Sequence, residues 1–442
     1  MIDYESAIRI ALKEARILGA ETIKIIDAAG RFTAENIYAK VFLPEFNNSA
    51  MDGYAVNSRF IQSASAGRPA ILRLKGESRA GDVPGKTSVS GLSAVKIFTG
   101  APIPRGADVV VKVEETAPVS MSPPVSITPP VSTPLLAGAP RSEFIKIYKP
   151  LKKWENVRFR GENIKPGQMI LRKGCRIRPQ EIGLLLQAGA LTVRVIKQPV
   201  AAILATGDEL VRPGQRKRPG KIANVNSYTI SGEIASAGAV PLDLGIARDD
   251  AADIRSKIKL GLAKADVLIV SAGISMGERD YVKKVFSELG VKQLFWKVAQ
   301  RPGEPLFFGI HSPAGRRYLP RGAARTLVFG IPGNTVSTMV CSKEYIKPAL
   351  LKMQGAQGAR GAADFMPVEI NAYLEEPVNV PGERRYFLRG SARLEDGKYF
   401  VKTTGEQGSG ILKSMVDANC LIIIPENIRA LGPGQIVKIQ LI

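Results

Sequence analysis

The stretch ADVLIVSAGISMGERDYVKKVFSELG, residues 265–290, decides the fold class of this chain. A short apolar run is followed by a glycine-rich loop and by apolar residues at helical spacing, which predicts a buried strand, a loop and a helix. The same plan recurs in PVAAILATGDEL (199–210) with NSYTISGEIASAGA (226–239), and in RTLVFGIPGNTVSTMVCSKEYIKPALLKM (325–353). This alternation predicts a doubly wound, mostly parallel α/β sheet whose ligand site lies beyond the carboxyl ends of the strands.

The flanking segments follow other patterns, and 442 residues are too many for a single core. Residues 4–18 have apolar side chains at helical spacing, and 117–140 are rich in Pro, Ser and Thr, so no packed core is expected there. We therefore expect four parts: a discontinuous helical and β-stranded part (1–29 and 141–178), a β-rich part with the Pro/Ser-rich insertion (30–140, insertion 117–140), the α/β domain (179–355) and a small C-terminal β-barrel (366–442).

Composition restricts the classes of partner. The chain has 62 Lys and Arg against 40 Asp and Glu, a net charge of +22, which favours anionic ligands. The densest basic run, RPGQRKRPG (212–220), is short, contains Pro and Gly and has no aromatic residue, so a nucleic-acid partner is not expected. Three scattered cysteines form neither a zinc motif nor a disulfide framework. Without a signal peptide or an apolar span of about 20 residues, we expect a cytoplasmic protein without a membrane partner.

Acidic and hydroxyl side chains gather where the predicted strands end. They are Asp208, Glu209, Asp249, Asp250, Ser271, Ser275 and Asp280. Carboxylates that converge on one crevice of a basic protein predict a hard cation, most simply Mg²⁺ on substrate phosphates. GIPGN (330–334), with Gly333 and Asn334, precedes a helix whose free N–H groups favour an anion.

Two shorter motifs leave alternatives open. Asp52 lies in the turn FNNSAMDGYAV (46–56), where it either closes an Asx-type turn or meets a cation or a substrate. GISMG (273–277) fits the G-x-S-x-G pattern of a nucleophile elbow, in which Ser275 would be the nucleophile of a serine hydrolase. Such an enzyme needs a histidine, and the single histidine, His311, lies in a segment that is typical of a hairpin tip.

Several motifs together carry a family resemblance. They are FNNSAMDGYAV, KIFTGAPIPRGADVVV, RGENIKPG, ATGDEL, NSYTI, SAGISMGERDYV, GIPGNTVST, FLRGSA and TTGEQGSG. In order and spacing they resemble the molybdopterin molybdenumtransferases, the MoeA/gephyrin-E family. The resemblance implies that adenylylated molybdopterin and molybdate give molybdenum cofactor and AMP, with Mg²⁺ assisting. It implies a four-domain homodimer with a linker and dimerisation domain, a β-rich lid domain, a molybdopterin-binding-like α/β domain and a C-terminal barrel, and an active site in a cleft between subunits.

The resemblance also implies roles for individual residues. The matching catalytic carboxylates are Asp52, Glu209, Asp249 and Asp280, of which the last three would hold the metal. The matching substrate-binding residues are Thr99, Ser275, Lys297, Arg301, Gly333, Asn334, Arg389 and Ser409. Lys297 and Arg301 are the expected cations for the oxyanion.

This chain departs from the family pattern at several places. Asn163 replaces an acidic residue, Arg301 and Glu304 replace the two lysines of KPGKP, Ala272 replaces a glycine, and NVN (224–226) replaces the usual Asp-Ser/Thr-Asn. Arg301 keeps a cation but with a planar group in place of a point charge. These departures leave tungstate open as the oxyanion. They also leave open a non-catalytic scaffold on the same fold, although a scaffold has no need for four converging carboxylates.

Overall fold

The computed structural model describes residues 1–119, 143–216, 218–274, 281–312, 325–356 and 365–442. The chain forms two compact units. The first unit comprises Met1–Asn36, Leu171–Ile182 and Thr192–Ile442, and the second comprises Ile37–Ile170 and Gly183–Leu191. The boundaries of the four expected parts stay a prediction.

The central sheet of the first unit has the strand order β16-β13-β17-β21-β20-β18. These strands are Val240–Ala247, Val200–Thr206, Val267–Ser271, Thr326–Ile331, Phe307–His311 and Val291–Trp296, in that order. The first four are parallel to one another, and β20 runs antiparallel to β21. Strand β18 pairs antiparallel with β20 and therefore runs in the same direction as the first four. The prediction of a mostly parallel sheet is confirmed.

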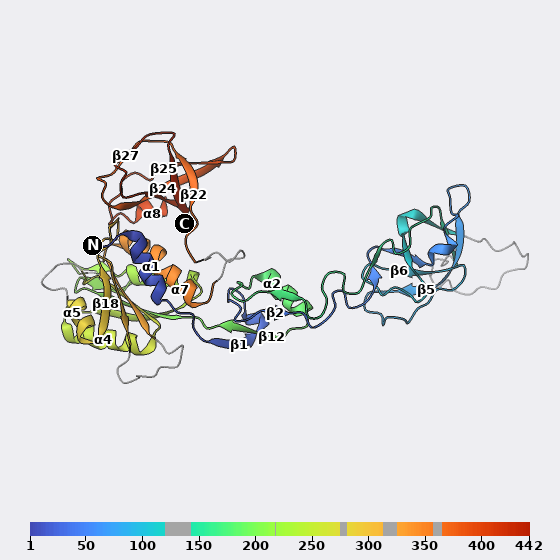
Figure 1. The fold of residues 1–442 in the computed structure, drawn as a ribbon, viewed down its shortest axis with the longest axis horizontal. Coiled ribbons are helices and arrows are strands. Elements are labelled where there is room, and N and C mark those ends of the chain that lie inside the picture. The colour runs from blue at the N-terminus through green and yellow to red at the C-terminus, as the bar shows by residue number, and fades with distance from the viewer. Residues whose placement is uncertain (120–142, 217, 275–280, 313–324, 357–364) are drawn as a thin grey trace, which may run out of the picture. The chain divides into compact units, whose positions relative to one another are not determined.

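Helices pack on both faces of this sheet (Figure 1). Alternate residues of a strand point to opposite faces, so Ile203 packs in one core and its neighbour Leu204 in another. The first core includes α1 (Tyr4–Glu14), α3 (Asn226–Ser236), α6 (Thr335–Cys341) and α7 (Lys347–Met353), and the second includes α4 (Ala251–Lys264) and α5 (Tyr281–Glu288). A π-helical turn, Ser342–Ile346, joins α6 to α7. The doubly wound arrangement follows from these two apolar faces.

The C-terminal region forms a closed barrel of five strands, β24-β25-β22-β28-β26, in which β26 pairs back to β24. These strands are Arg385–Glu395, Lys398–Thr403, Ile370–Leu374, Ile436–Leu441 and Cys420–Ile424. The barrel shares a core with the α/β domain: the Tyr4 ring of α1 lies 5.4 Å from the Phe387 ring of β24 and 5.9 Å from the Tyr345 ring. The predicted barrel is confirmed.

The remaining elements of the chain are short. In the first unit β1 (Ala20–Lys24) pairs with β12 (Thr192–Ile196). Helix α2 (Pro179–Gln187) contributes residues to both units. The others are β2 (Ile37–Tyr38), β11 (Met169–Leu171), β14 (Leu210–Val211), β15 (Ile222–Ala223), β19 (Gln300–Arg301), β23 (Val378–Asn379), β27 (Ala430–Leu431) and α8 (Lys413–Val416). Among the described residues, no helix combines the length and the apolar character that a membrane span requires.

The second unit is built on a six-stranded sheet of order β7-β4-β6-β5-β9-β8. These strands are Val109–Lys112, Gly53–Val56, Ser93–Ile97, Ala70–Ser78, Phe144–Ile147 and Thr116–Val119. Residues 117–119, the start of the Pro/Ser-rich segment, belong to β8, which pairs with β9 through backbone hydrogen bonds. No residue of β8 is buried, which agrees with the expectation that this segment has no packed core. Residues 120–142 lie outside the described residues.

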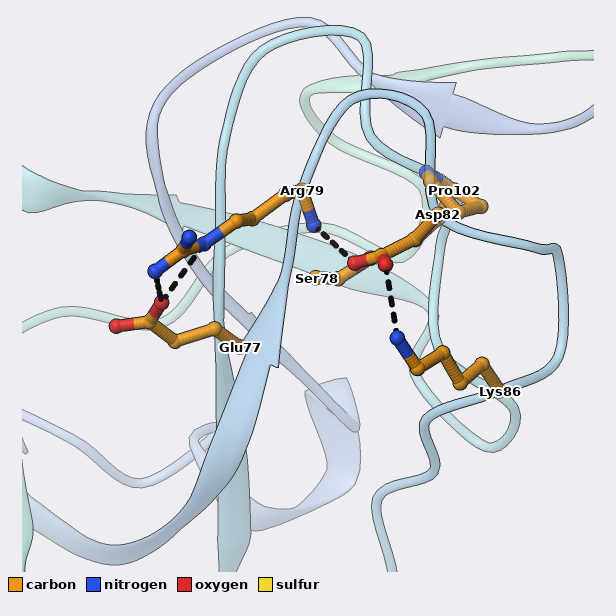
Figure 2. A network of polar contacts seen from close by, with 6 residues as sticks. All are labelled: Glu77, Ser78, Arg79, Asp82, Lys86 and Pro102. Carbon is orange, nitrogen blue, oxygen red and sulfur yellow. Dashed lines mark hydrogen bonds and ion pairs between the residues drawn. The ribbon is translucent and has the colours of Figure 1, made fainter.

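A polar network holds the loop that follows β5 in the second unit (Figure 2). The Asp82 carboxylate accepts from the Arg79 backbone N–H at 2.7 Å and pairs with the Lys86 ammonium at 3.0 Å, while the Arg79 side chain pairs with Glu77. Next to it, Ser78 Oγ donates to the Pro102 carbonyl at 2.8 Å. The chain between β6 and Pro102, which contains Thr99, is thereby tied to β5.

Candidate functional site

A pocket of about 430 Å³ lies in the first unit beyond the carboxyl ends of β13, β17 and β21. Its lining includes Thr206, Ser271, Ala272, Gly333 and Asn334, each at or just after one of these strand ends. Parallel strands bring their carboxyl ends to one edge, so residues far apart in sequence meet there. The pocket therefore lies where the alternation of strands and helices predicts it.

Asn226, the first residue of α3, ties two loops of the pocket together. Its Nδ2 donates to Ser271 Oγ at 3.0 Å and to the Gly333 carbonyl at 2.7 Å. The Oδ1 of the same amide is buried without a partner among the described residues. Sequence reasoning did not select Asn226, although the position at the start of a helix after a strand was a usable signal.

Asn224, the first residue of the NVN segment, makes hydrogen bonds that an aspartate at this position could accept in part. Its Oδ1 accepts from the Ser227 backbone N–H at 3.2 Å, and its Nδ2 donates to Ser227 Oγ at 2.9 Å. An acceptor oxygen is what the start of a helix requires, and an asparagine supplies it as well as an aspartate does. The local structure before α3 is therefore kept while one negative charge is lost.

The predicted carboxylates lie on the loops that follow β13 and β16. Glu209 lines the pocket. Asp208 and Asp249 bridge the two loops reciprocally, since the backbone N–H of each donates to the carboxylate of the other at 3.3 Å. Lys221 donates to the Asp208 carbonyl. Asp280 and Ser275 lie outside the described residues.

The donor set has the chemistry that Mg²⁺ requires. Among the described residues no group of three metal-ligating side chains occurs. Mg²⁺ is commonly held by one or two carboxylates together with water and substrate phosphates, so it needs no full protein cage. Glu209 and Asp249, two hard oxygen ligands on adjacent strand-end loops, fit this smaller requirement.

The barrel reaches the pocket through Asn334, whose Nδ2 donates to Ser409 Oγ at 3.0 Å. Arg389 holds the loop that carries Ser409. Arg389 is 1 % exposed, and its guanidinium donates to Ser414 Oγ at 3.0 Å, to the Gly408 carbonyl at 3.0 Å and to the Glu406 carbonyl at 3.4 Å. Burial lowers the pKa of Arg389. These contacts make Arg389 a support of the loop, while its predicted contact with substrate stays a prediction.

The predicted oxyanion cations lie on the segment after β18. Lys297 has a positive φ of 64°, and its ammonium lies 4.9 Å from the centre of the Trp296 ring. Trp296 Nε1 donates to the carbonyl of Ile274, a pocket residue. Arg301 is exposed and forms no ion pair with a described residue. Glu304, which reverses a charge relative to the family pattern, pairs with Arg384 at 2.6 Å, so its charge is compensated.

Ala272 has a φ of 74°, in the left-handed region that favours glycine. The family pattern has glycine here, and the alanine methyl group adds strain and volume at the pocket wall. Strained backbone of this kind is concentrated at functional sites. A Cβ built on Gly333 would lie 3.2 Å from that methyl group, so the two loops approach closely.

Asp52 and Thr99 meet in the second unit. The Thr99 backbone N–H and hydroxyl both donate to Asp52 Oδ1, at 2.7 and 2.8 Å, and these bonds lower the pKa of Asp52. Asp52 is exposed, and its carboxylate is bound by a residue 47 positions away rather than by its own turn. Gly53 is required next to it, because a Cβ there would lie 1.9 Å from the Val111 carbonyl oxygen on β7.

The position of His311 gives no support to the serine hydrolase alternative, whose nucleophile Ser275 lies outside the described residues. His311 is the last residue of β20 and pairs with Thr326, the first residue of the antiparallel strand β21, so it lies where the chain leaves β20 toward β21. The pocket lies at the other end of β21, five residues of about 3.3 Å each away, or about 16 Å. His311 is therefore at the edge of the sheet opposite the loop that carries the G-x-S-x-G motif. Burial lowers the pKa of His311.

Comparison with known proteins places these observations in a family. The chain matches the MoeA N-terminal region (domain I and II) over residues 2–189, a probable molybdopterin binding domain over 202–352 and the MoeA C-terminal region (domain IV) over 371–442. It is 31% identical to a molybdopterin molybdenumtransferase of Haemophilus influenzae, covering 95% of this chain and 93% of that protein, and 30% identical to one of Nostoc, covering 95% and 88%. A molybdopterin biosynthesis MoeA protein of Pyrococcus horikoshii has a similar structure, with a TM-score of 0.76, 26% identity and full coverage of both chains. The chain belongs to the molybdopterin molybdenumtransferase family of molybdenum cofactor biosynthesis.

Proposed function

We propose that this protein, acting as a homodimer, inserts molybdenum into adenylylated molybdopterin and releases AMP in a reaction that depends on Mg²⁺. Molybdate is the proposed metal source, and tungstate is a chemically close alternative. The observation that carries the proposal is the pocket beyond β13, β17 and β21, with Glu209 on its wall and Asp249 on the neighbouring loop.

The pocket residues are suited to a polyanionic substrate with a neutral polar body. Glu209 and Asp249 would hold Mg²⁺, which neutralises phosphate charge when bound. Asn226 and Asn334 are amides whose hydrogen bonds to Gly333 and Ser409 hold the pocket loops in place. Directional contacts of this kind orient a ligand without adding charge. The predicted participation of Asp280 and Ser275 rests on the family resemblance.

Capture of the oxyanion is assigned to Lys297 and Arg301. Molybdate and tungstate are compact dianions, and an arginine offers them a planar pair of donors. Arg301 has no ion pair among the described residues, so its charge is available. Asp52, kept ionised by Thr99, is proposed as a further carboxylate of the reaction.

The test is release of AMP from adenylylated molybdopterin, measured with molybdate or tungstate and with Mg²⁺ present or chelated. Arg301→Gln is expected to raise the oxyanion concentration for half-maximal activity at least tenfold, which corresponds to about 1.4 kcal/mol. Arg9→Gln, which removes the same charge from the exposed side of α1, is the matched control. It is expected to change the oxyanion concentration for half-maximal activity less than twofold.

Two results would overturn the proposal. Wild-type protein that binds adenylylated molybdopterin but releases no AMP under any of these conditions would support the scaffold alternative. Equal weakening by Arg301→Gln and Arg9→Gln would assign Arg301 to the general positive field of the protein instead of the oxyanion site.

A further inference from the structure

The second unit presents an aromatic and basic surface within the segment KKWENVRFR (152–160). Trp154 is 38% exposed and Phe159 is 41% exposed, and their rings pack edge to face with centroids 5.4 Å apart and planes at 63°. We call Trp154 and Phe159, with the four cations Lys152, Lys153, Arg158 and Arg160, the aromatic platform. Two large apolar rings side by side in solvent gain little from folding, so their exposure requires another explanation.

The backbone beneath the platform is strained and firmly held. Trp154 has a φ of 71° and Asn156 a φ of 60°, and a bulky residue in this left-handed region is an outlier. The Trp154 N–H donates to the Asp108 carbonyl at 2.5 Å, and Asn156 Nδ2 donates to the Val110 carbonyl at 2.8 Å. Strain of this kind persists where function selects it, and here it presents a tryptophan ring to solvent.

The charges of the platform are available to a ligand. Lys152, Lys153, Arg158 and Arg160 are all exposed, and within the described residues none of them forms an ion pair. The two carboxylates of the neighbourhood accept from backbone instead: Glu155 from the Lys152 N–H at 3.0 Å and Glu162 from the Phe159 N–H at 2.8 Å. The Arg160 guanidinium lies 4.0 Å from the centre of the Phe42 ring, which fixes its position.

The platform adjoins the turn that carries Asp52. Strand β10 (Val157–Arg158) pairs antiparallel with β3 (Asn48–Ser49), and the Ala50 N–H donates to the Asn156 carbonyl at 2.9 Å. Asp52 follows Ala50 by two residues. A ligand bound on the platform would therefore lie beside the carboxylate that Thr99 keeps ionised.

We propose that the platform binds a planar heteroaromatic ring that carries phosphate, with the ring stacked on Trp154 or Phe159 and the phosphate facing the four cations. Stacking between aromatic side chains and bases, combined with nearby positive charge, is a general mode of nucleotide binding. Adenylylated molybdopterin has two such rings, and its assignment as the natural ligand rests on the proposed function. A single-stranded nucleic acid is less suited, because two rings within nine residues do not form the long groove that follows a backbone.

The test uses AMP as the probe and reads binding without activity. Trp154 is one of two tryptophans, so stacking is expected to quench a large share of the intrinsic fluorescence of the wild-type chain. Affinities of the wild type and of every variant are compared by titration calorimetry, because Trp154→Gly lacks the reporting ring. Trp154→Gly is expected to weaken AMP binding at least tenfold, and because glycine accepts the positive φ, it is also expected to unfold at the same or a higher temperature than wild type. Phe159→Leu is the second variant, with at least fivefold weaker binding expected. Arg68→Gln, which removes an exposed cation from the turn that precedes β5, is the control.

Loss of AMP binding by Trp154→Gly with retained thermal stability supports the platform. AMP binding that is unchanged in both aromatic variants overturns it, and so does a short poly(U) strand that binds more than tenfold tighter than AMP. The AMP-release assay separates this proposal from the proposed function. Lost AMP binding with wild-type turnover in Trp154→Gly would refute adenylylated molybdopterin as the ligand of the platform while the enzyme assignment stands. AMP quenching in a protein that lacks turnover would support the platform while the enzyme assignment fails.

Discussion

Replacing Arg389 by methionine tests whether this arginine supports a loop or touches substrate. The substitution keeps the buried stem and removes the donors to Ser414, Gly408 and Glu406. Ser414 Oγ keeps its bond to the Ile411 carbonyl, so two carbonyls lose a donor. A buried polar group that loses its hydrogen bond costs about 1–3 kcal/mol. Glu406 and Gly408 are exposed, so water can partly replace the lost donors, and we expect Arg389→Met to lower the free energy of unfolding by about 2–3 kcal/mol in total.

The assay is hydrogen exchange of the amides in residues 404–412, together with the urea midpoint of the intact chain. Faster exchange in Arg389→Met, and a smaller effect in Arg389→Lys, are expected. In the AMP-release assay, Arg389→Met and Ser409→Ala should be non-additive, because both break the contact of Ser409 with Asn334. If Arg389→Met leaves exchange in this loop unchanged and still weakens oxyanion binding, the supporting role is refuted and Arg389 contacts the substrate.

The other predictions concern single side chains. Thr99→Val removes one of two hydrogen bonds to Asp52, so the pKa of Asp52 should rise toward its ordinary value and the acidic limb of the pH–rate profile should move to higher pH; an unmoved limb would mean that ionisation of Asp52 does not control the rate. Ala272→Gly relieves a left-handed backbone worth about 1–2 kcal/mol and adds unfolded-state freedom worth about 0.5–1 kcal/mol, so a net stabilisation of about 0.5–1 kcal/mol is expected in urea unfolding; a destabilised variant would contradict the strain. Burial raises the pKa of Glu344 above its usual 4.5, so the folded chain keeps a proton that the unfolded chain releases. Stability should therefore fall as pH rises from about 4.5 through the folded-state pKa, and Glu344→Gln should flatten this decline in unfolding curves recorded against pH.

Local patterns were sufficient for the architecture of the first unit. The parallel strands and their helices follow from residues such as Ile203 and Leu204, whose neighbours in sequence face opposite cores. The position of the pocket also follows, because the carboxyl ends of parallel strands share an edge. The pairing of β8 with β9 at the start of the Pro/Ser-rich insertion did not follow from composition, because backbone hydrogen bonds hold it and none of its side chains is buried.

The site could be predicted only in part. Motif spacing selected Glu209, Asn334 and Asp52. Glu209 and Asn334 line the pocket, and Asn334 also donates to Ser409. Asp52 accepts hydrogen bonds from Thr99. Asn226 was missed, because its importance comes from two hydrogen bonds to loops 45 and 107 residues away. The aromatic platform was missed as well, since the exposure of Trp154 depends on a backbone conformation that residue types do not reveal.

The sequence by itself determined the strands and helices of the α/β sheet and the edge of the sheet that carries the pocket, because the period of buried residues and the turn chemistry are properties of short stretches of chain. Tertiary structure alone decided how the functional side chains are used. It turned Arg389 inward onto the loop of Ser409, joined Asp52 to Thr99 across 47 residues, and placed His311 at the far edge of the sheet from the G-x-S-x-G loop. The physical reason is that a hydrogen-bond partner is set by which surfaces meet in space, and that information is not contained in the local pattern of either partner.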